Sequence, residues 1–232
     1  DEAAAAYEEA RHLEPENGEL YYFSAGVYLE QGRVDESINA LRESLQLDPY
    51  QRLARSALVY ALNYPSGVEP ELKLEEALRW GDMHATDVLA RGVHDNSPEP
   101  NRCLRVGYVS PDFRDHSVAF FLEPLLDQHD SAAIETYSYA NVERPDAMTT
   151  QLQKAVHHWH DISQLTDTQV ADQVAADEID ILVDLAGHTL GGRLGVFALK
   201  PAPVQVSYLG YPATTGVAAI DYRRRRNGNM PR

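Results

Sequence analysis

Two runs of apolar residues near the start of the chain recur at intervals of three and four, as on one face of a helix. Gly32 separates the runs, and the second run ends at Asp48 and Pro49. The pattern predicts two short helices joined by a glycine turn. The apolar positions are Tyr21, Ala25, Tyr28, Ile38, Leu41, Leu45 and Leu47.

This helical pair belongs to a longer repeat. Pro15 and Pro49 end two similar stretches and lie 34 residues apart, the spacing of tetratricopeptide repeats. At this spacing large residues fill the space between helices, and small residues let the helices approach. A plain helical hairpin is the alternative. Because such repeats do not bury their faces singly, we expect the solenoid to continue upstream of residue 1. The matched pairs are Tyr7 with Leu41, Ala10 with Ser44, and Leu13 with Leu47.

Helix-like segments without a clear repeat follow, and a polar, Pro-bearing stretch at 94–102 indicates a boundary. The sequence therefore predicts four parts. Residues 1–50 are tetratricopeptide repeats and 51–101 a helical linker. Residues 102–222 form an α/β lobe, and 223–232 an atypical basic tail, for which a solvated, disordered end is the simplest interpretation.

Beyond the boundary, strand-like runs such as CLRVGYV, IETYSYA, IDILVDLAG and PVQVSYLGYP alternate with helical stretches. This alternation predicts βαβ units and a mainly parallel, Rossmann-like sheet. Ligands of such sheets lie beyond the carboxyl ends of the strands. We therefore expect residues 110–116, 187–189 and 210–216 to lie along one rim of the sheet.

Composition narrows the class of protein. The formal net charge of −16 argues against general binding to nucleic acid, which requires a basic surface. No apolar run approaches the ~20 residues that span a bilayer, and no basic, apolar leader opens the chain. Cys103 is the single cysteine, so no internal disulfide forms, which fits a cytoplasmic protein.

Helical repeats followed by RVGYVSPDFRDHSV resemble the O-linked N-acetylglucosamine transferase family, including its bacterial and SPINDLY-like members. DILVDLAGHTLGGR and FALKPAPVQVSYLGYPATTG agree in the expected order, and the resemblance covers about Ser56 to Tyr222. It implies the first lobe of a GT-B glycosyltransferase. It also implies an inverting transfer from UDP-N-acetylglucosamine to protein Ser or Thr hydroxyls, without a metal or another cofactor. The repeat groove would bind the acceptor protein.

The chain departs from the family pattern near its end. In such enzymes a second α/β lobe binds the nucleotide, but this sequence closes with RRRRNGNMPR soon after Tyr222. We interpret this as a truncated or frame-shifted end and expect negligible activity from the chain alone. Two other functions stay open. One is a SPINDLY-like transfer of fucose from GDP-fucose, and the other is a non-catalytic repeat scaffold.

The resemblance assigns site residues. His116 corresponds to the histidine at the junction of sugar and acceptor, as a base or a positioning group, and Asp172 to a carboxylate considered as a proton carrier. Asp112 is interpreted as a cap of the following turn. The expected sugar-binding or donor-binding residues are Gly187, His188, Thr189, Leu209, Gly210, Pro212, Thr214 and Thr215.

The sequence assigns no definite ligand-binding role to two further groups of residues. Arg193 either pairs with Asp184 or meets a phosphate. The cluster from His157 to His160 resembles a metal site, but neighbouring strand residues point to opposite faces and no cysteine lies close. We therefore expect no metal site in this chain.

Overall fold

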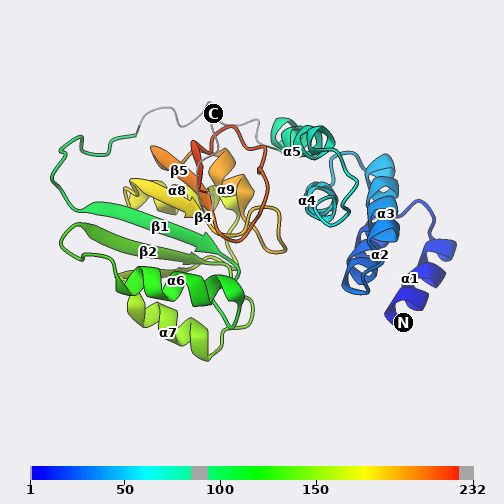
Figure 1. Ribbon diagram of the computed structural model, residues 1–232, viewed down its shortest axis with the longest axis horizontal. Helices are drawn as coiled ribbons and strands as arrows, with labels where there is room; N and C mark the ends of the chain where they lie inside the picture. The colour runs from blue at the N-terminus through cyan, green and yellow to red at the C-terminus, as the bar shows by residue number, and fades with distance from the viewer. Residues whose placement is uncertain (1, 85–93, 225–232) are drawn as a thin grey trace. The chain divides into compact units, whose positions relative to one another are not determined.

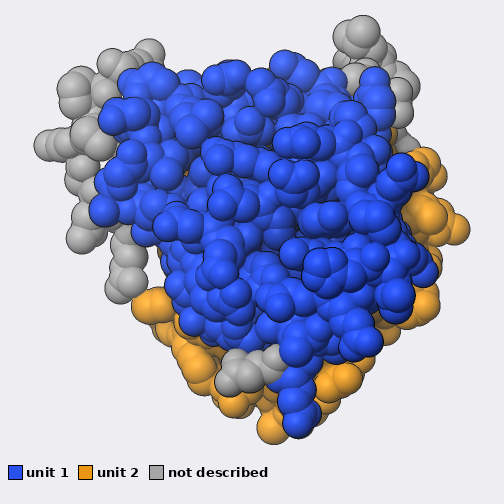
Figure 2. Space-filling model, turned by 90° about the vertical axis from the view of Figure 1, so that its right-hand side faces the viewer, with its two compact units in different colours: residues 1–84 blue, residues 85–232 orange. Residues whose placement is uncertain are grey.

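The computed structural model describes residues 2–84 and 94–224. The chain forms two compact units, Asp1–His84 and Ala85–Arg232, which are coloured separately in Figure 2. Unit 1 is helical, and unit 2 holds a sheet with helices on its faces (Figure 1). This arrangement confirms the predicted combination of helical repeats and an α/β lobe.

Unit 1 consists of antiparallel helices whose contacts depend on small side chains. In the core, Ala25 and Ala54 are almost fully buried beside Leu41. Ser37 donates a hydrogen bond to the carbonyl of Ala25 at 2.8 Å, so α3 lies directly against the backbone of α2. The helices are α1 (Glu2–Leu13), α2 (Gly18–Glu30), α3 (Val34–Leu47), α4 (Arg52–Ala61) and α5 (Pro70–His84).

The predicted turn between α2 and α3 follows from one residue. Gly32 has a φ of 73°, a left-handed conformation that only glycine adopts without strain. At the start of α2, the Asn17 side chain accepts a hydrogen bond from the Glu19 amide and caps the helix. Helix α4 shares one core with α2 and α3, so part of the predicted linker belongs to the repeat unit.

Unit 2 is built on a six-stranded parallel sheet in the order β3-β2-β1-β4-β5-β6. The strand order reverses between β1 and β4, the point at which such sheets bind ligands. The strands are β1 (Leu104–Ser110), β2 (Ile134–Ala140), β3 (His158–Asp161), β4 (Ile181–Asp184), β5 (Val204–Tyr208) and β6 (Tyr222–Arg224).

Two apolar clusters hold helices on the two faces of this sheet. Val106 and Tyr108 of β1 pack with Leu122 of α6, whereas Leu182 of β4 packs on the opposite side with Phe197 of α9. The near-continuous burial of β1 and β4 fits a sheet that is covered on both sides. The helices are α6 (Ser117–Asp127), α7 (Ala147–Ala155), α8 (Asp167–Ala176) and α9 (Leu194–Ala198).

The last strand differs from the prediction of a basic tail from residue 223. Arg223 lies in β6, beside Ser207 of β5, and the strand continues to residue 224. Asp221 directly precedes β6 and fixes the beginning of this strand beside β5. Its carboxylate accepts hydrogen bonds from the Gln205 amide at 2.7 Å and from the Lys200 ammonium at 2.5 Å. Residues 225–232 of the predicted tail, and residues 85–93 before the boundary, lie outside the described residues.

Residues 94–103 are fixed to the edge of the sheet where β1 and β4 begin. Arg102 forms two hydrogen bonds, at 2.6 and 2.5 Å, with the carboxylate of Asp180. The same carboxylate accepts from the Asn96 side chain at 2.7 Å and from the Arg105 amide at 2.9 Å. Burial alone would raise the pKa of Asp180, but these donors outweigh it and lower the pKa.

Replacing this carboxylate should loosen the attachment. We expect D180N to lower the free energy of unfolding of unit 2 by about 2 kcal/mol, because hydrogen bonds to charged groups are lost at a mostly buried position. Since the pKa of Asp180 is lowered on folding, its contribution is present above the unfolded pKa of about 3.9 and disappears as the pH falls through the folded value.

Urea unfolding in the W80F background measures this effect, because Trp159 is then the only tryptophan and lies in unit 2. The exposed Glu99, replaced in E99Q, is the control in the same segment. Equal stability of D180N and the parent between pH 5 and pH 8 would show that this network does not hold the segment.

Candidate functional site

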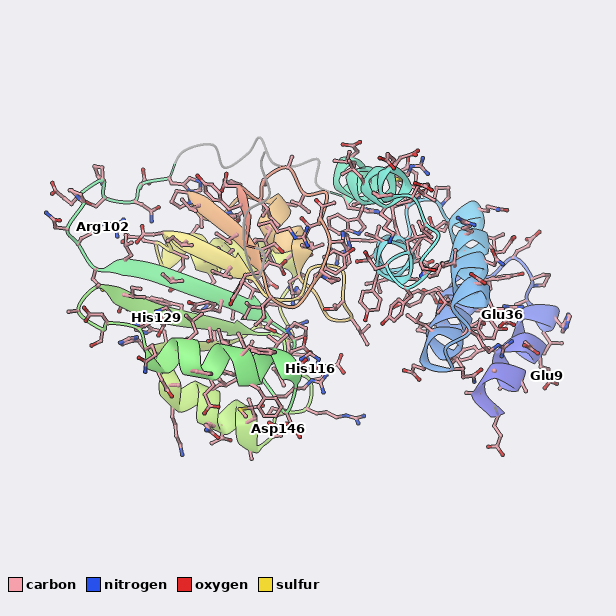
Figure 3. The ribbon with its side chains drawn as sticks, viewed as in Figure 1. Glu9, Glu36, Arg102, His116, His129 and Asp146 are labelled. Atoms are coloured by element: carbon pink, nitrogen blue, oxygen red, sulfur yellow. The ribbon has the colours of Figure 1, made fainter. Side chains whose placement is uncertain are left out.

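Three loops follow β1, β4 and β5 and meet at the carboxyl edge of the sheet, as the sequence predicts. Figure 3 shows His116 and Asp146 at the end to which the arrows of β1 and β2 point, and Arg102 at the opposite end. The β1 loop is also fixed to α7, because the Asp115 amide donates to the Asp146 carboxylate at 2.7 Å. The loops thus lie on both sides of the point where the strand order reverses.

His116 begins α6. Its backbone is extended, with a φ of −155°, and its Nδ1 accepts a hydrogen bond from the Val118 amide at 3.2 Å. An Nδ1 that accepts carries no proton, so the neutral ring holds its proton on Nε2. The side chain is about one-third exposed. His116 therefore presents an N–H donor at the rim, and a base at Nε2 would first require the proton to move.

Asp112, interpreted from sequence as a cap of the following turn, is not the cap of α6. The helix begins five residues later, and the cap is His116. Asp112 is buried, with one oxygen 3.4 Å from the Arg114 guanidinium and the other 3.7 Å from Nδ1 of His116. The carboxylate is thus a second possible partner for the imidazole, on the same nitrogen that now serves as the cap.

The loop after β4 turns sharply at Gly187, whose φ is 57°. A Cβ atom there would lie 2.5 Å from Cβ of Tyr211, so the glycine allows the β5 loop to approach. A Cβ at Gly210 would lie 1.8 Å from the Leu185 carbonyl oxygen. Gly187 and Gly210, which are predicted to contact the sugar, are therefore also required for the contact between the two loops.

His188 is buried, and its Nε2 donates to the Thr215 carbonyl at 2.9 Å. Burial lowers the pKa of His188 to about 4, opposed by this bond, so the ring is neutral at pH 7. Thr189 is half-buried and donates to the Ala186 carbonyl at 2.9 Å. Both predicted donor-side residues thus bind the protein itself, and His188 joins the β4 loop to the β5 loop.

The β5 loop contains the other predicted sugar contacts. Leu209 has a φ of 76°, an uncommon conformation for a leucine, and Pro212 is exposed. The Thr214 side chain accepts from the Gly216 amide at 3.3 Å, which leaves its hydroxyl proton able to donate. Thr215 is buried. Pro212 is therefore the exposed member of this set, and Thr214 is the member whose hydroxyl can donate.

Arg193 pairs with neither Asp184 nor an open phosphate position. Its Nε bonds to Asp167 at 2.7 Å, and its terminal nitrogens donate to the carbonyls of Ile162 and Leu165 and to Asn141. The guanidinium thus joins the loop before α9 to the loop before α8. Its role in the described structure is to hold these loops together.

Asp172 belongs to α8 and to none of the three loops. It is an exposed residue in the middle of α8, whereas Val170, Ala171 and Val174 of this helix face the core. The structure therefore brings His116 near the rim with the residues of the β4 and β5 loops, and leaves Asp172 on a helix surface.

The histidines from 157 to 160 bind side chains of the protein. His158 contacts Glu135 at 2.8 Å, which lowers the pKa of that carboxyl, and His160 lies 3.2 Å from Asp177. His157 accepts from the Thr136 amide. Among residues 2–84 and 94–224, no group of three or more His, Cys, Asp or Glu side chains could hold a metal ion, and none of the helices is long and apolar enough to cross a membrane.

A parallel sheet with this strand order and three loops at its reversal point defines a Rossmann-like ligand-binding lobe, joined here to helical repeats. Residues 87–225 match the family described as glycosyl transferase family 41, and residues 1–62 match a tetratricopeptide repeat. The chain belongs to glycosyl transferase family 41.

Relatives and a solved structure agree. The chain is 39% identical over 184 residues to the probable UDP-N-acetylglucosamine–peptide N-acetylglucosaminyltransferase SPINDLY of Petunia hybrida, covering 77% of this chain and 20% of that protein. It is 38% identical over 121 residues to the UDP-N-acetylglucosamine–peptide N-acetylglucosaminyltransferase of Caenorhabditis elegans, covering 51% of this chain and 10% of the relative. A mutant Thermobaculum terrenum O-GlcNAc transferase superimposes with a TM-score of 0.92 and 38% identity, covering 95% of this chain and 42% of that one.

The cap at His116 gives a prediction that does not depend on activity. H116A should lower the free energy of unfolding of unit 2 by about 1 kcal/mol, because the Val118 amide loses its acceptor, whereas H116N should stay within a few tenths, since asparagine is a good cap. Urea unfolding followed through Trp159 in the W80F background compares them. Equal losses in H116A and H116N would contradict the cap.

Proposed function

We propose that this chain is the part of a protein glycosyltransferase that binds the acceptor and the sugar of the donor, and that the enzyme transfers N-acetylglucosamine from UDP-N-acetylglucosamine to Ser or Thr hydroxyls. The observation that carries the proposal is the meeting of the β1, β4 and β5 loops at the reversal point of the sheet. Family membership and the printed activities of the relatives support it. The repeats of unit 1 bind the acceptor protein, as their class suggests.

In this proposal the acceptor hydroxyl lies beside His116 and attacks C1 of the sugar from the face opposite the diphosphate. The C–O bond to the diphosphate breaks, the anomeric configuration inverts, and the nucleotide leaves as UDP. Nε2–H of His116 hydrogen-bonds the acceptor or the sugar and orients it. In this proposal the carboxylate of Asp112, which lies 3.7 Å from Nδ1 of His116, takes the proton of the hydroxyl as the new C–O bond forms.

The β4 and β5 loops bind the sugar. Thr214 offers a hydroxyl proton, and Thr189 offers the lone pairs of its oxygen while it donates to Ala186. Leu209, Gly210 and Pro212 supply shape through the backbone. The nucleotide is bound outside the residues of this chain. The proposal requires no metal or other cofactor and includes a cytoplasmic location, supported by the single Cys103.

A fusion tests this function. In the fusion, this chain replaces the matching 42% of the Thermobaculum terrenum O-GlcNAc transferase, so that the second lobe of that enzyme completes the site. We expect labelled sugar to pass from UDP-N-acetylglucosamine to an acceptor protein, unchanged by EDTA. The chain alone should show no turnover above background.

Each other result of the fusion experiment has a defined meaning. Transfer only from GDP-fucose would replace the donor in our proposal. A folded fusion that transfers from neither donor, while unit 1 still binds acceptor proteins, would favour a non-catalytic scaffold. Robust turnover by the chain alone would contradict the division of the site between two lobes.

A further inference from the structure

The carboxylate of Asp184 lies at the end of β4 and is almost completely buried. Oδ1 accepts from the amides of Ala186 and Gly187 at 3.1 and 2.9 Å. Oδ2 accepts from the Ser207 hydroxyl of β5 at 3.0 Å and is 3.1 Å from the Gly187 amide. One side chain therefore shapes the turn at Gly187 and links it to the neighbouring strand.

This arrangement has a free-energy cost that a simple turn does not require. Burial raises the pKa of Asp184, and the donors from Gly187, Ala186 and Ser207 oppose that shift. A buried carboxylate is costly unless its oxygens are hydrogen-bonded, and both oxygens of Asp184 are. A serine or asparagine could also close a turn after a strand, but neither has two side-chain oxygens that accept from the turn amides and from Ser207 together.

A second buried side chain continues the connection. His188 follows the turn directly, and its ring reaches the Thr215 carbonyl of the β5 loop. Gly187 lies against Tyr211, and Gly210 against the Leu185 carbonyl. The Asp184–Ser207 and His188–Thr215 hydrogen bonds therefore join the two donor-side loops at both ends.

We infer that Asp184 is a positioning residue for the donor sugar: it holds the β4 and β5 loops in their binding conformation before the sugar arrives. This inference rests on the proposed function, since it assigns the two loops to the donor side. Asp184 acts through Gly187, Ser207 and the adjoining loop, and contacts no substrate itself. The expected consequence is a loss of donor affinity when the link is broken.

The size of the loss of donor affinity depends on how much of the time the two loops occupy the binding conformation. If breaking the link leaves the binding conformation populated about one-tenth of the time, the apparent donor affinity falls about tenfold. Once the donor is bound, the loops are ordered again, so kcat changes less than the donor KM. The acceptor KM should not change, because the β1 loop with His116 has no hydrogen bond to Asp184 among the described contacts.

The fusion with the Thermobaculum terrenum lobe provides the test. We expect D184A to raise the donor KM about tenfold, and S207A, which removes only the link to β5, to raise it severalfold. D184N should recover most of the loss, because an amide oxygen can accept from the Gly187 turn and the Ser207 hydroxyl can reorient. The control is S138A, which changes an equally buried serine on β2 of the same sheet.

The outcomes separate this inference from the proposed function. An active parent fusion with unchanged donor KM in S207A and D184A would overturn the role of Asp184 and leave the function standing. If D184A and S207A lower kcat to the same extent while the donor KM and the acceptor KM stay unchanged, the two variants are damaged in general. That result would also overturn the role of Asp184. An inactive parent fusion would reject the function. In that case, amide exchange on this chain decides whether the link exists: S207A must speed exchange at Gly187 and in residues 209–216, and unchanged exchange would refute the link.

Discussion

The close approach of the β4 and β5 loops is the constraint on which the candidate site depends. A Cβ at Gly210 would lie 1.8 Å from the Leu185 carbonyl oxygen, and one at Gly187 would lie 2.5 Å from Tyr211. No side chain fits at such distances, so the two backbones are in direct contact. The parallel register of β4 with β5 brings the loops together, and the buried carboxylate of Asp184 fixes their positions.

The two histidines of this rim show how burial divides similar residues between roles. His188 is buried and neutral, and its proton is used on the Thr215 carbonyl. His116 is partly exposed, and its cap to the Val118 amide occupies Nδ1 and leaves the proton on Nε2. Only His116 therefore has a donor available to a ligand, and the helix start fixes which nitrogen carries it. The fold thus determines the tautomer of His116 as well as the position of its ring.

Much of the fold could be predicted from the sequence, because periodicity reports burial. The strands at IETYSYA and LRVGYV, the helical pair around Gly32 and the shared rim all follow from local patterns. Arg223 in β6 could not be predicted, since its strand begins through the bonds of Asp221 to Gln205 and Lys200, residues far away in the sequence. The same holds for His188 and Arg193, because the partners of a polar side chain depend on loops that meet only in the folded chain.

Thermal unfolding of unit 2 in G210A, followed through Trp159 in the W80F background, tests the central claim most directly. The account predicts a severe loss of more than about 3 kcal/mol, because the added methyl collides with backbone that has no room to move. S138A is the control in the same unit, because it changes a buried side chain of the sheet without adding an atom. A G210A protein as stable as its parent would show that the loops do not touch, and the description of the rim would be wrong.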